Sequence, residues 1–545
     1  MASSRTRLIR LLDKGFYPVE LPPPFKTRNF SNVKDSLRPP NNYFGSTTFF
    51  DGATFRGPLR TFGVINPASY LLLSRFIAEH WSDISGVFDL SRCSGTRPTF
   101  PPLGAEGRAI ETASLASKRK SQRHLASVYP VILGLDINRF YGSIYTHSVP
   151  WSVLGKQEAK KRHRNRTLQG HWSDTLDKLV RNCNQQQTVG IPIGPDTSRI
   201  ISELILSRID AELTSVGSGL ASPQIYHNID DYQIGCMALG ESENAQSRFV
   251  RTISRYELRL NDFKTSVDHG LSFAPSNFQR HFDCLDQQRD RNFVEHFFEI
   301  LYAQVPLHPN TNVLGYAIKR FARNLARNKE RGLVREYLQR LVFAVPHQAR
   351  WILPLLLGIY RAEGLNAEVR RIIGWGIETC VRRNDVGSLL WFLYAAIFLD
   401  MRLAGALCNL CIGMSNELVD LVLYHGRSAG LFSFNLSEMR SRYRSNDFGS
   451  SAWLPIYEVG RRGWDASPSF SKFGTADDPN DLYQHLSNHG VEFYITDQDH
   501  FEVSAFDGWR LAQAYFESEE YDSEFQGDME LNVRYLGHGQ WDNYE

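Results

Sequence analysis

The sequence predicts an α+β protein whose first half mixes strands with helices and whose second half is mainly helical. Between residues 131 and 265, short apolar segments bounded by turn residues are typical of strands. From about residue 290, apolar residues recur at helical spacing, with breaks about every 17 to 20 residues, which favours an α-solenoid of stacked helix pairs. From residue 450 on, short strands, predicted at Val491 to Ile495 and at His500 to Val503, alternate with acidic helix and coil.

Length and composition describe an ordinary globular chain. Its 545 residues are enough for about two to four domains, and 42% hydrophobic and 22% charged residues are usual for a soluble protein. The N-terminus lacks the apolar stretch of a secretory signal. The longest apolar run, Leu389 to Leu399, is shorter than the roughly 20 residues that cross a bilayer, so we expect a buried helix there. We expect a cytoplasmic protein without membrane contact.

The seven cysteines are odd in number and scattered, which fits reduced thiols. Cys408 and Cys411 form a lone CxxC without a second pair or a nearby histidine cluster. A zinc site needs four ligands, so we expect this pair on a core-facing helical turn.

Charge is distributed unevenly along the chain. Residues 471–545 hold 17 acidic and three basic side chains, a net charge of −14; since the whole chain carries +2, the first 470 residues carry +16. A strongly basic body favours a polyanionic partner, with nucleic acid as the first candidate. The acidic segment fits a solvated face, a docking segment for a partner, or a mimic that covers the basic surface.

The N-terminal residues 1–60 are predicted to form a proline-rich arm laid over the first domain. Glu20 to Thr27 contains three consecutive prolines, which forbid helix and favour an extended polyproline II conformation. A helix is predicted from Asn66 to Trp81. A dense basic patch follows further on, formed by Lys118, Arg119, Lys120 and Arg123. This patch fits contact with a triphosphate or a solvated surface about equally well.

Val131 to Asp136 is predicted to be a buried strand that delivers one carboxylate to a sheet edge. Phe140 and Tyr141 follow, and these adjacent aromatics fit either the core or a floor under a bound nucleotide. The loop Gln187 to Pro195 is punctuated by glycine and proline and leads into a helix. The apolar face of that helix recurs at close to 3.6-residue spacing. It consists of Ile200, Ile201, Leu204, Ile205 and Ile209.

Asp230 and Asp231 lie at the predicted bend between two short strands, Tyr226 to His227 and Tyr232 to Met237. Adjacent carboxylates repel each other unless a cation lies beside them, and their oxygens suit a hard divalent ion such as magnesium. Taken alone, the stretch fits a solvated turn better, because Asp is a common turn residue. The order of elements around it reverses that preference.

That order is strand and Asp136, loop and helix, hairpin with Asp230 and Asp231, then helix, strand and Lys264. Three carboxylates at strand ends or turns can converge on two metal ions, as nucleotidyl transfer requires. A later lysine can protonate or neutralise the leaving pyrophosphate. We therefore predict Asp136, Asp230, Asp231 and Lys264 as catalytic residues, with Mg²⁺ or Mn²⁺ as cofactor.

Residues from about 60 to 285 resemble the palm of a reverse transcriptase. Asp136 matches the first catalytic Asp, and Tyr141, five residues on, matches the aromatic steric gate that excludes a ribose 2′-OH. The loop at 190–195, the Asp-Asp box at 228–231 and a fourth motif at 260–265 match in the same order. The resemblance implies fingers and palm at 61–285, an α-helical repeat domain at 286–430 and a mixed α/β acidic segment at 431–545.

The resemblance also implies a set of contacts. The residues expected at the metal ions are Asp136, Ile137, Asp230 and Asp231. The residues expected at the nucleotide are Tyr141, Phe140, Gly194, Lys118, Arg119 and Arg123.

More narrowly, the chain resembles bacterial phage-defence reverse transcriptases of the abortive-infection or "unknown group" class. The motifs that carry this resemblance are Glu20 to Phe25, Phe140 to His147, Ile191 to Pro195 and the helical C-terminal half. It implies a DNA polymerase that uses dNTPs without a conventional template, often starting from a hydroxyl of the protein, so that single-stranded DNA becomes covalently attached. It also implies homo-oligomers and an anti-phage role; some relatives act with a noncoding RNA and a second reverse transcriptase.

Two residues depart from the family pattern. Asn228 stands where Tyr or Phe is usual, and Ile193 stands where templated enzymes usually have Gln. Both argue against ordinary RNA-templated copying. They also motivate the alternative hypothesis, a non-catalytic nucleic-acid-binding scaffold that serves a partner polymerase. His147 is expected to be a structural hydrogen-bonding residue, because two-metal transfer needs no histidine.

Overall fold

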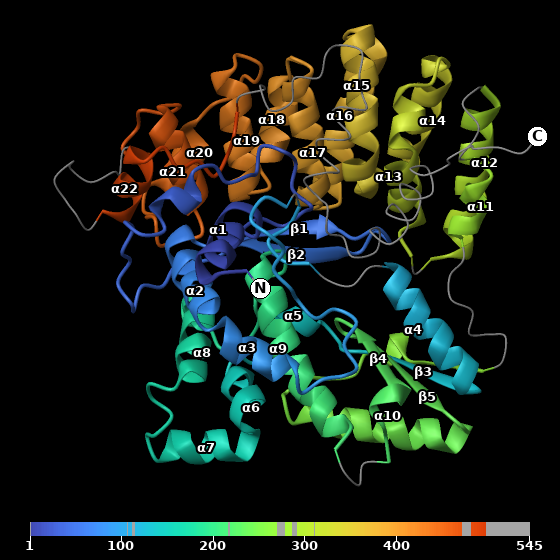
Figure 1. Cartoon of the computed structure of the whole chain (residues 1–545). Coiled ribbons are helices and arrows are strands. Elements are labelled where there is room, and N and C mark those ends of the chain that lie inside the picture. Colours follow the sequence, from blue (N-terminus) through green and yellow to red (C-terminus); the bar gives the residue numbers. More distant parts are fainter. Residues whose placement is uncertain are drawn as a thin grey trace, which may run out of the picture.

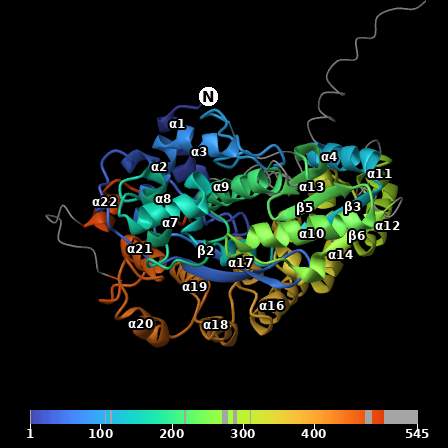
Figure 2. The same ribbon diagram turned by 90° about the horizontal axis from the view of Figure 1, so that it is seen from below.

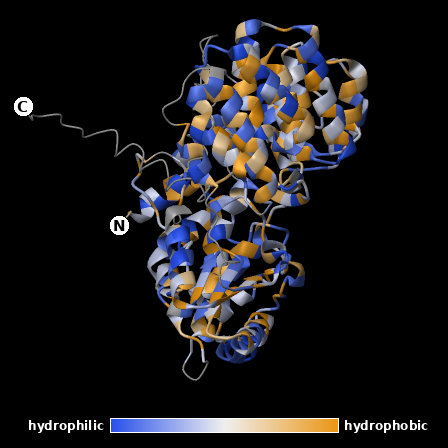
Figure 3. Cartoon of the chain, turned by 90° about the vertical axis from the view of Figure 1, so that its right-hand side faces the viewer, coloured by the Kyte–Doolittle hydropathy of each residue, from blue (hydrophilic) through white to orange (hydrophobic). Residues whose placement is uncertain are grey.

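A row of helices lies above a mixed layer that contains two small sheets (Figure 1). The structure is a computed structural model that describes residues 2–105, 107–111, 115–215, 219–269, 278–285, 291–309, 311–470 and 481–496. One hydrophobic core is continuous from Leu8 to Tyr494 and joins both layers. Apolar residues run through the helices of the row and the strands of the lower sheet (Figure 3). The predicted α+β class is confirmed.

The N-terminal residues are part of the core rather than an arm laid over it. Helix α1 (Ser4–Lys14), capped by the Ser3 hydroxyl, packs on α2 (Pro67–Glu79). Phe16 and Phe25 are buried in the main core. Strands β1 (Thr48–Ala53) and β2 (Leu59–Val64) form an antiparallel hairpin. The predicted boundary at residue 60 is therefore wrong, because it cuts through β2.

The second sheet has the strand order β4-β5-β3-β6, with every neighbouring pair antiparallel. Its strands are β3 (Val131–Asp136), β4 (Ile225–Asn228), β5 (Asp231–Cys236) and β6 (Ser266–His269). This confirms the predicted strand ending in Asp136 and the predicted hairpin. Alternation along β3 turns Val131, Leu133 and Leu135 into the main core, where α10 (Leu239–Ser254) crosses the sheet beside α9 (Asp196–Leu213) (Figure 2).

The opposite face of this sheet carries the remaining alternate residues and is partly covered by α4 (Leu115–Val128). Leu125 of α4 packs with Ile132 and Tyr226 in a small second cluster, and Tyr129 closes it. The Tyr129 ring leaves no room for a side chain at Gly235, since a Cβ atom at that position would lie 2.2 Å from the ring. Helices α4 and α10 thus lie on opposite sides of the sheet (Figure 1).

Short helices link β3 to α9 and complete the lower layer. They are α5 (Phe140–Ser143), α6 (Ser148–Leu154), α7 (Lys156–Arg164) and α8 (Trp172–Asn182). Helix α3 (Trp81–Phe88) packs on α9 from the side of α2.

The helices of the upper row form a two-layered stack. Helices α13, α15, α17, α19 and α21 contact one another in succession, while α14, α16 and α18 pack outside them. The bounds are α12 (Arg291–Leu307), α13 (Val313–Ala326), α14 (Arg331–Ala344), α15 (Ala349–Glu363), α16 (Ala367–Arg382), α17 (Val386–Phe398), α18 (Gly405–Ile412) and α19 (Glu417–Ser428). Helix α11 (Gln279–Asp283) already packs on α12, so the helical part begins before the predicted residue 286.

Two expectations about apolar and cysteine residues hold. The apolar run Leu389 to Leu399 lies in α17 and its C-terminal cap; the residues of α17 are all buried, and the helix contacts β1. Cys408 and Cys411 are free and buried on α18. By length and composition, no single helix of the described ranges could cross a membrane, although the bent pair Arg331–Ala344 and Pro346–Glu363 passes the same test together.

The described part of segment 431–545 is helical, not mixed α/β as predicted. It contains α20 (Ser437–Tyr443), α21 (Trp453–Arg462) and α22 (Leu482–Asn488), and within residues 491–495 only Glu492 makes an isolated bridge, so no strand forms there. The predicted strand His500 to Val503 and most of the acidic residues lie outside the described residues.

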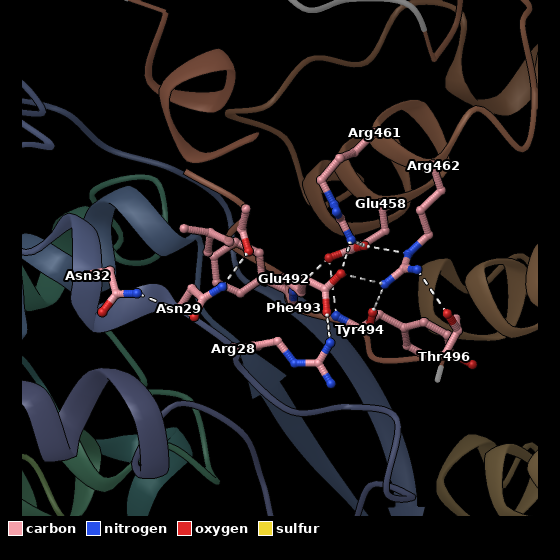
Figure 4. A network of polar contacts seen from close by, with 12 residues as sticks. Arg28, Asn29, Asn32, Glu458, Arg461, Arg462, Glu492, Phe493, Tyr494 and Thr496 are labelled. Carbon is pink, nitrogen blue, oxygen red and sulfur yellow. Dashed lines mark hydrogen bonds and ion pairs between the residues drawn. The ribbon is translucent and has the colours of Figure 1, made fainter. Parts of the chain in front are cut away.

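A polar clasp ties this end of the chain back to its beginning (Figure 4). The buried Glu458 of α21 accepts hydrogen bonds from the main-chain N–H groups of Phe493 and Tyr494, at 2.6 and 3.1 Å. Arg28 pairs with Glu492, both through their side chains at 2.9 Å and through an antiparallel bridge. The clasp thus joins segments more than 460 positions apart in the chain.

We expect Glu458→Ala to destabilise the protein by about 3 kcal/mol or more, because two buried N–H groups and two arginines lose their acceptor. The midpoint of chemical denaturation measures this loss. The matched control is Glu438→Ala, which removes an exposed partner of Arg442 and should cost no more than about 0.5 kcal/mol. Equal effects of the two variants would contradict the clasp's importance.

Candidate active site

Three carboxylates from separate strand ends meet at one edge of the second sheet. Asp136, Asp230 and Asp231 each offer an oxygen, and these atoms all lie within 4.8 Å of one another. The strand register produces this meeting, because Asp136 at the end of β3 is paired with Asp231 at the start of β5. Asp230 precedes it in the β4–β5 turn, and its carbonyl accepts the Ile137 N–H at 3.2 Å. The convergence predicted from the sequence is confirmed.

Asp136 is the buried member and has two side-chain donors. The Asn261 amide donates to Asp136 Oδ1 at 2.8 Å, and Lys264 Nζ lies 2.6 Å from Oδ2. Both donors come from the segment around the 3-10 turn Asp262–Lys264, which is tied to the end of β3 by the Asn261 N–H bond to the Asp136 carbonyl. The predicted Lys264 is therefore brought to the carboxylates, with its side chain about half exposed.

Desolvation and the crowding of like charges shift the titration of the other two acids. Burial, followed by repulsion from Asp231 and Asp136, raises the pKa of Asp230 to about 7. Burial also raises the pKa of Asp231, while the Lys118 ammonium opposes that shift. A cation among the three carboxylates would relieve the repulsion. An all-oxygen carboxylate set that keeps solvent access at Asp230 and Asp231 fits Mg²⁺ or Mn²⁺.

Tyr141 borders the same site. It lies on α5, and the Ser202 hydroxyl of α9 donates to the Tyr141 hydroxyl at 3.4 Å. Burial raises the pKa of Tyr141, and the charges of Arg199, Asp230 and Arg60 are close enough to contribute to the shift. No pattern in the sequence indicates that Arg199 or Arg60 lies near this site. Arg199 lies on α9 and Arg60 on β2, and both are distant from Tyr141 in the sequence.

Other predicted contacts divide into supported and unsupported ones. The charge of Lys118 acts on Asp231, which supports its predicted place near the site. Arg123 lies further along α4 and is exposed, and no contact with the site supports its prediction. Arg119 is half-buried on the same helix. For Ile137, the side chain is buried and the N–H is bonded to Asp230, so only its carbonyl could face an ion.

Two predicted nucleotide contacts need correction. The Phe140 side chain is only 2% exposed and packs in the main core, so the prediction that it lies at the nucleotide is wrong. Gly194 has a φ of +122°, and a Cβ atom there would lie 2.3 Å from the Pro18 ring, so packing explains the glycine. Its carbonyl accepts from the Arg108 guanidinium at 2.7 Å.

A buried polar pair behind the Asp230 turn was not among the residues predicted from the sequence. His227 Nε2 lies 2.8 Å from Asp210 Oδ2 of α9, and neither side chain is exposed. Asp210 and its neighbours outweigh burial and raise the pKa of His227 to about 9. A signal existed in the sequence, since His227 stands at an inward position of the alternating strand. By contrast, His147 contacts Asp177 at 2.6 Å, in line with its predicted structural role.

No protein-family model matches the chain, and no curated protein matches it. Among solved structures, apo telomerase from Candida tropicalis is similar over 66% of this chain, with 10% sequence identity and a TM-score of 0.30. This chain spans about 65% of the length of that telomerase chain. At such a TM-score the similarity does not establish a shared fold.

The raised pKa of Asp230 predicts a pH-dependent stability of the metal-free protein. A carboxyl whose folded pKa of about 7 exceeds its unfolded value near 4 loses stability as pH rises between those values. Asp230→Asn should therefore stabilise the protein at pH 8 by about 1–2 kcal/mol after solvent screening, and by roughly a third of that amount at pH 5, where the unfolded carboxyl is already mostly ionised. Thermal unfolding in EDTA measures this, with Asp268→Asn on β6 as control. Equal effects at both pH values would contradict the coupling.

Proposed function

We propose that this protein is a metal-dependent nucleotidyltransferase, a reverse-transcriptase-like DNA polymerase. The observation that carries the proposal is the cluster of Asp136, Asp230 and Asp231 on paired antiparallel strands, with Lys264 beside it. A folded chain has no stability reason to gather three repelling carboxylates, so their placement points to a role with cations.

Asp136, Asp230 and Asp231 would hold Mg²⁺ or Mn²⁺ ions, which supply activation of the attacking hydroxyl and charge neutralisation at the triphosphate. Lys264 places a proton donor 2.6 Å from Asp136, where it can neutralise or protonate the leaving pyrophosphate. The Tyr141 ring would exclude the 2′-OH of a ribonucleotide. Lys118 is the member of the predicted basic patch whose charge acts on Asp231, and it would contact phosphate.

The proposed mode of synthesis rests on the two residues that depart from the reverse-transcriptase pattern, and the proposed biological role rests on the motifs that match it. Asn228, which pairs with Asp231 across the hairpin, and Ile193, whose carbonyl accepts the Gly63 N–H at 3.0 Å, support untemplated or unusually templated synthesis. Protein priming, homo-oligomers, a noncoding RNA or second polymerase as partner, and a role in bacterial anti-phage defence belong to the same proposal. Their support is the resemblance of the sequence motifs.

Nucleotide incorporation tests the proposal directly. Purified protein with Mg²⁺ or Mn²⁺ should add labelled dNTPs, and Asp136→Ala or Asp230→Ala should lower the rate at least about a hundredfold. Asp268→Ala is the matched control, because Asp268 pairs with Ile132 on the same face, four residues along β3 from Asp136; its rate should stay within about twofold. Full activity of Asp230→Ala, or no incorporation by the wild type, would refute the assignment; tight nucleic-acid binding without incorporation would favour the scaffold alternative.

Sugar selection is expected to depend on Tyr141. Tyr141→Val should raise the ratio of ribonucleotide to deoxyribonucleotide incorporation about tenfold or more, because a smaller side chain leaves space for the 2′-OH. Competition between labelled CTP and dCTP measures the ratio. Tyr145→Val, four residues on and also half-buried, should leave it unchanged. If both variants shifted the ratio equally, the effect would come from general loosening.

A further inference from the structure

The turn that carries the two adjacent acids has an unfavourable backbone conformation. Asn228 pairs with Asp231, so Ile229 and Asp230 are the two residues of the hairpin turn. Ile229 has a φ of +55°, in the left-handed region that β-branched residues avoid at a cost of about 1–3 kcal/mol. Such a residue keeps this conformation only when its surroundings hold it there.

One restraint acts on the carbonyl of Ile229. His227 Nδ1 lies 3.0 Å from this oxygen, while His227 Nε2 lies 2.8 Å from Asp210 Oδ2. Asp210 itself accepts hydrogen bonds from the Tyr232 and Ser91 hydroxyls, so it acts as a carboxylate acceptor. Since both ring nitrogens face acceptors, both must donate, and the imidazole is held as a buried cation.

A second restraint acts on the N–H of the same residue. The Ile229 N–H donates to the Thr96 hydroxyl at 3.1 Å, and that hydroxyl lies 3.5 Å from Glu203 Oε2. Thr96 and Glu203 are both buried. Glu203 and Asp210 stand seven residues apart on α9, two helical turns, and therefore on one face. One rigid helix thus reaches both polar groups of the strained residue.

We propose that α9 positions the Asp230–Asp231 turn through these two relays, with His227 and Thr96 as positioning residues for the carboxylate site. The inference rests on the proposed function, because it assigns the relays to the metal-binding geometry of that site. Neither side chain touches the reacting groups. Each fixes one main-chain group of Ile229 and so fixes where the next two carboxylates point.

The geometry separates this role from ordinary core packing. A buried histidine that only filled space would need one hydrogen-bond partner on a neighbouring element. His227 instead spans from α9 to the turn carbonyl, and Thr96 reaches the turn N–H from an independent loop. The Asp230 carbonyl then bonds Ile137, which follows Asp136, so a shift of the turn would change the spacing of all three acids.

An isosteric pair of variants at Thr96 tests the inference in the full chain. Thr96→Val removes the hydroxyl at nearly constant volume, whereas Thr96→Ser keeps it. The probe is Mn²⁺ alone, with binding to the nucleotide-free protein measured by electron paramagnetic resonance. Thr96→Val should weaken Mn²⁺ binding about tenfold. The Mn²⁺ concentration needed for half-maximal incorporation should rise by the same factor. For Thr96→Ser, both quantities should stay within about twofold of wild type.

A second pair of variants distinguishes an effect of His227 on Mn²⁺ binding from an effect on protein stability. His227→Gln removes the ring donor to the Ile229 carbonyl, whereas Tyr232→Phe removes only a hydroxyl donor to Asp210. At comparable losses of melting temperature, His227→Gln should weaken Mn²⁺ binding and Tyr232→Phe should not. Hydrogen exchange of residues 228–231 should increase in Thr96→Val and His227→Gln only.

The outcomes distinguish this inference from the proposed function. If Asp230→Ala abolishes Mn²⁺ binding while Thr96→Val and His227→Gln bind as the wild type does, the inference is overturned and the proposed function stands. If the wild-type chain binds no Mn²⁺ at the three acids, both are overturned. A lower melting temperature with unchanged Mn²⁺ affinity would assign the relays to stability alone and overturn the inference.

Discussion

The register between β3 and β5 is the constraint on which the candidate site depends. Asp136 and Asp231 are paired across these strands, so both side chains emerge on the same face. A slip by one residue would turn one carboxylate into the core, because side chains alternate with a period of two. The apolar partners prevent that slip: Leu133 and Ile234 are paired on the core face, where α10 packs on both strands.

Helix α9 connects the Asp230 turn to Tyr141. Ser202 and Glu203 are neighbours on it, yet one reaches Tyr141 and the other reaches Thr96 under the Asp230 turn. A single helix therefore sets the distance between the tyrosine that would select the sugar and the turn that holds two of the acids. Its buried acids carry a desolvation cost, which is compensated by hydrogen bonds from His227, Tyr232 and Thr96.

The sequence was sufficient for the parts of the site that depend on local pattern. The strand ending in Asp136, the hairpin with Asp230 and Asp231, and the apolar face of α9 all follow from periodicity and turn chemistry. Lys264 followed from its place in the order of elements.

What the sequence could not supply depends on contacts between distant segments. His227 and Asp210 are both polar residues in apolar surroundings, and nothing local says that each is the other's partner. The prolines of residues 1–60 predict an arm laid over the first domain, but Phe16 and Phe25 bury that stretch in the main core. The prediction that Phe140 lies at the nucleotide rests on its neighbour Tyr141, but successive residues of a helix point in different directions.

The buried N-terminal stretch links the helical row to the site by direct contact. Tyr17 donates to the Phe493 carbonyl in the clasp, and Arg108 donates to the Tyr17 carbonyl at 2.6 Å. The same guanidinium binds Asp196, the first residue of α9, at 2.6 Å, and the Gly194 carbonyl just before it. The clasp beside α21 therefore fixes the start of the helix whose later turns hold the carboxylate hairpin. Since each of these contacts is buried or half-buried, the upper row acts as a support for the site and not as a separate appendage.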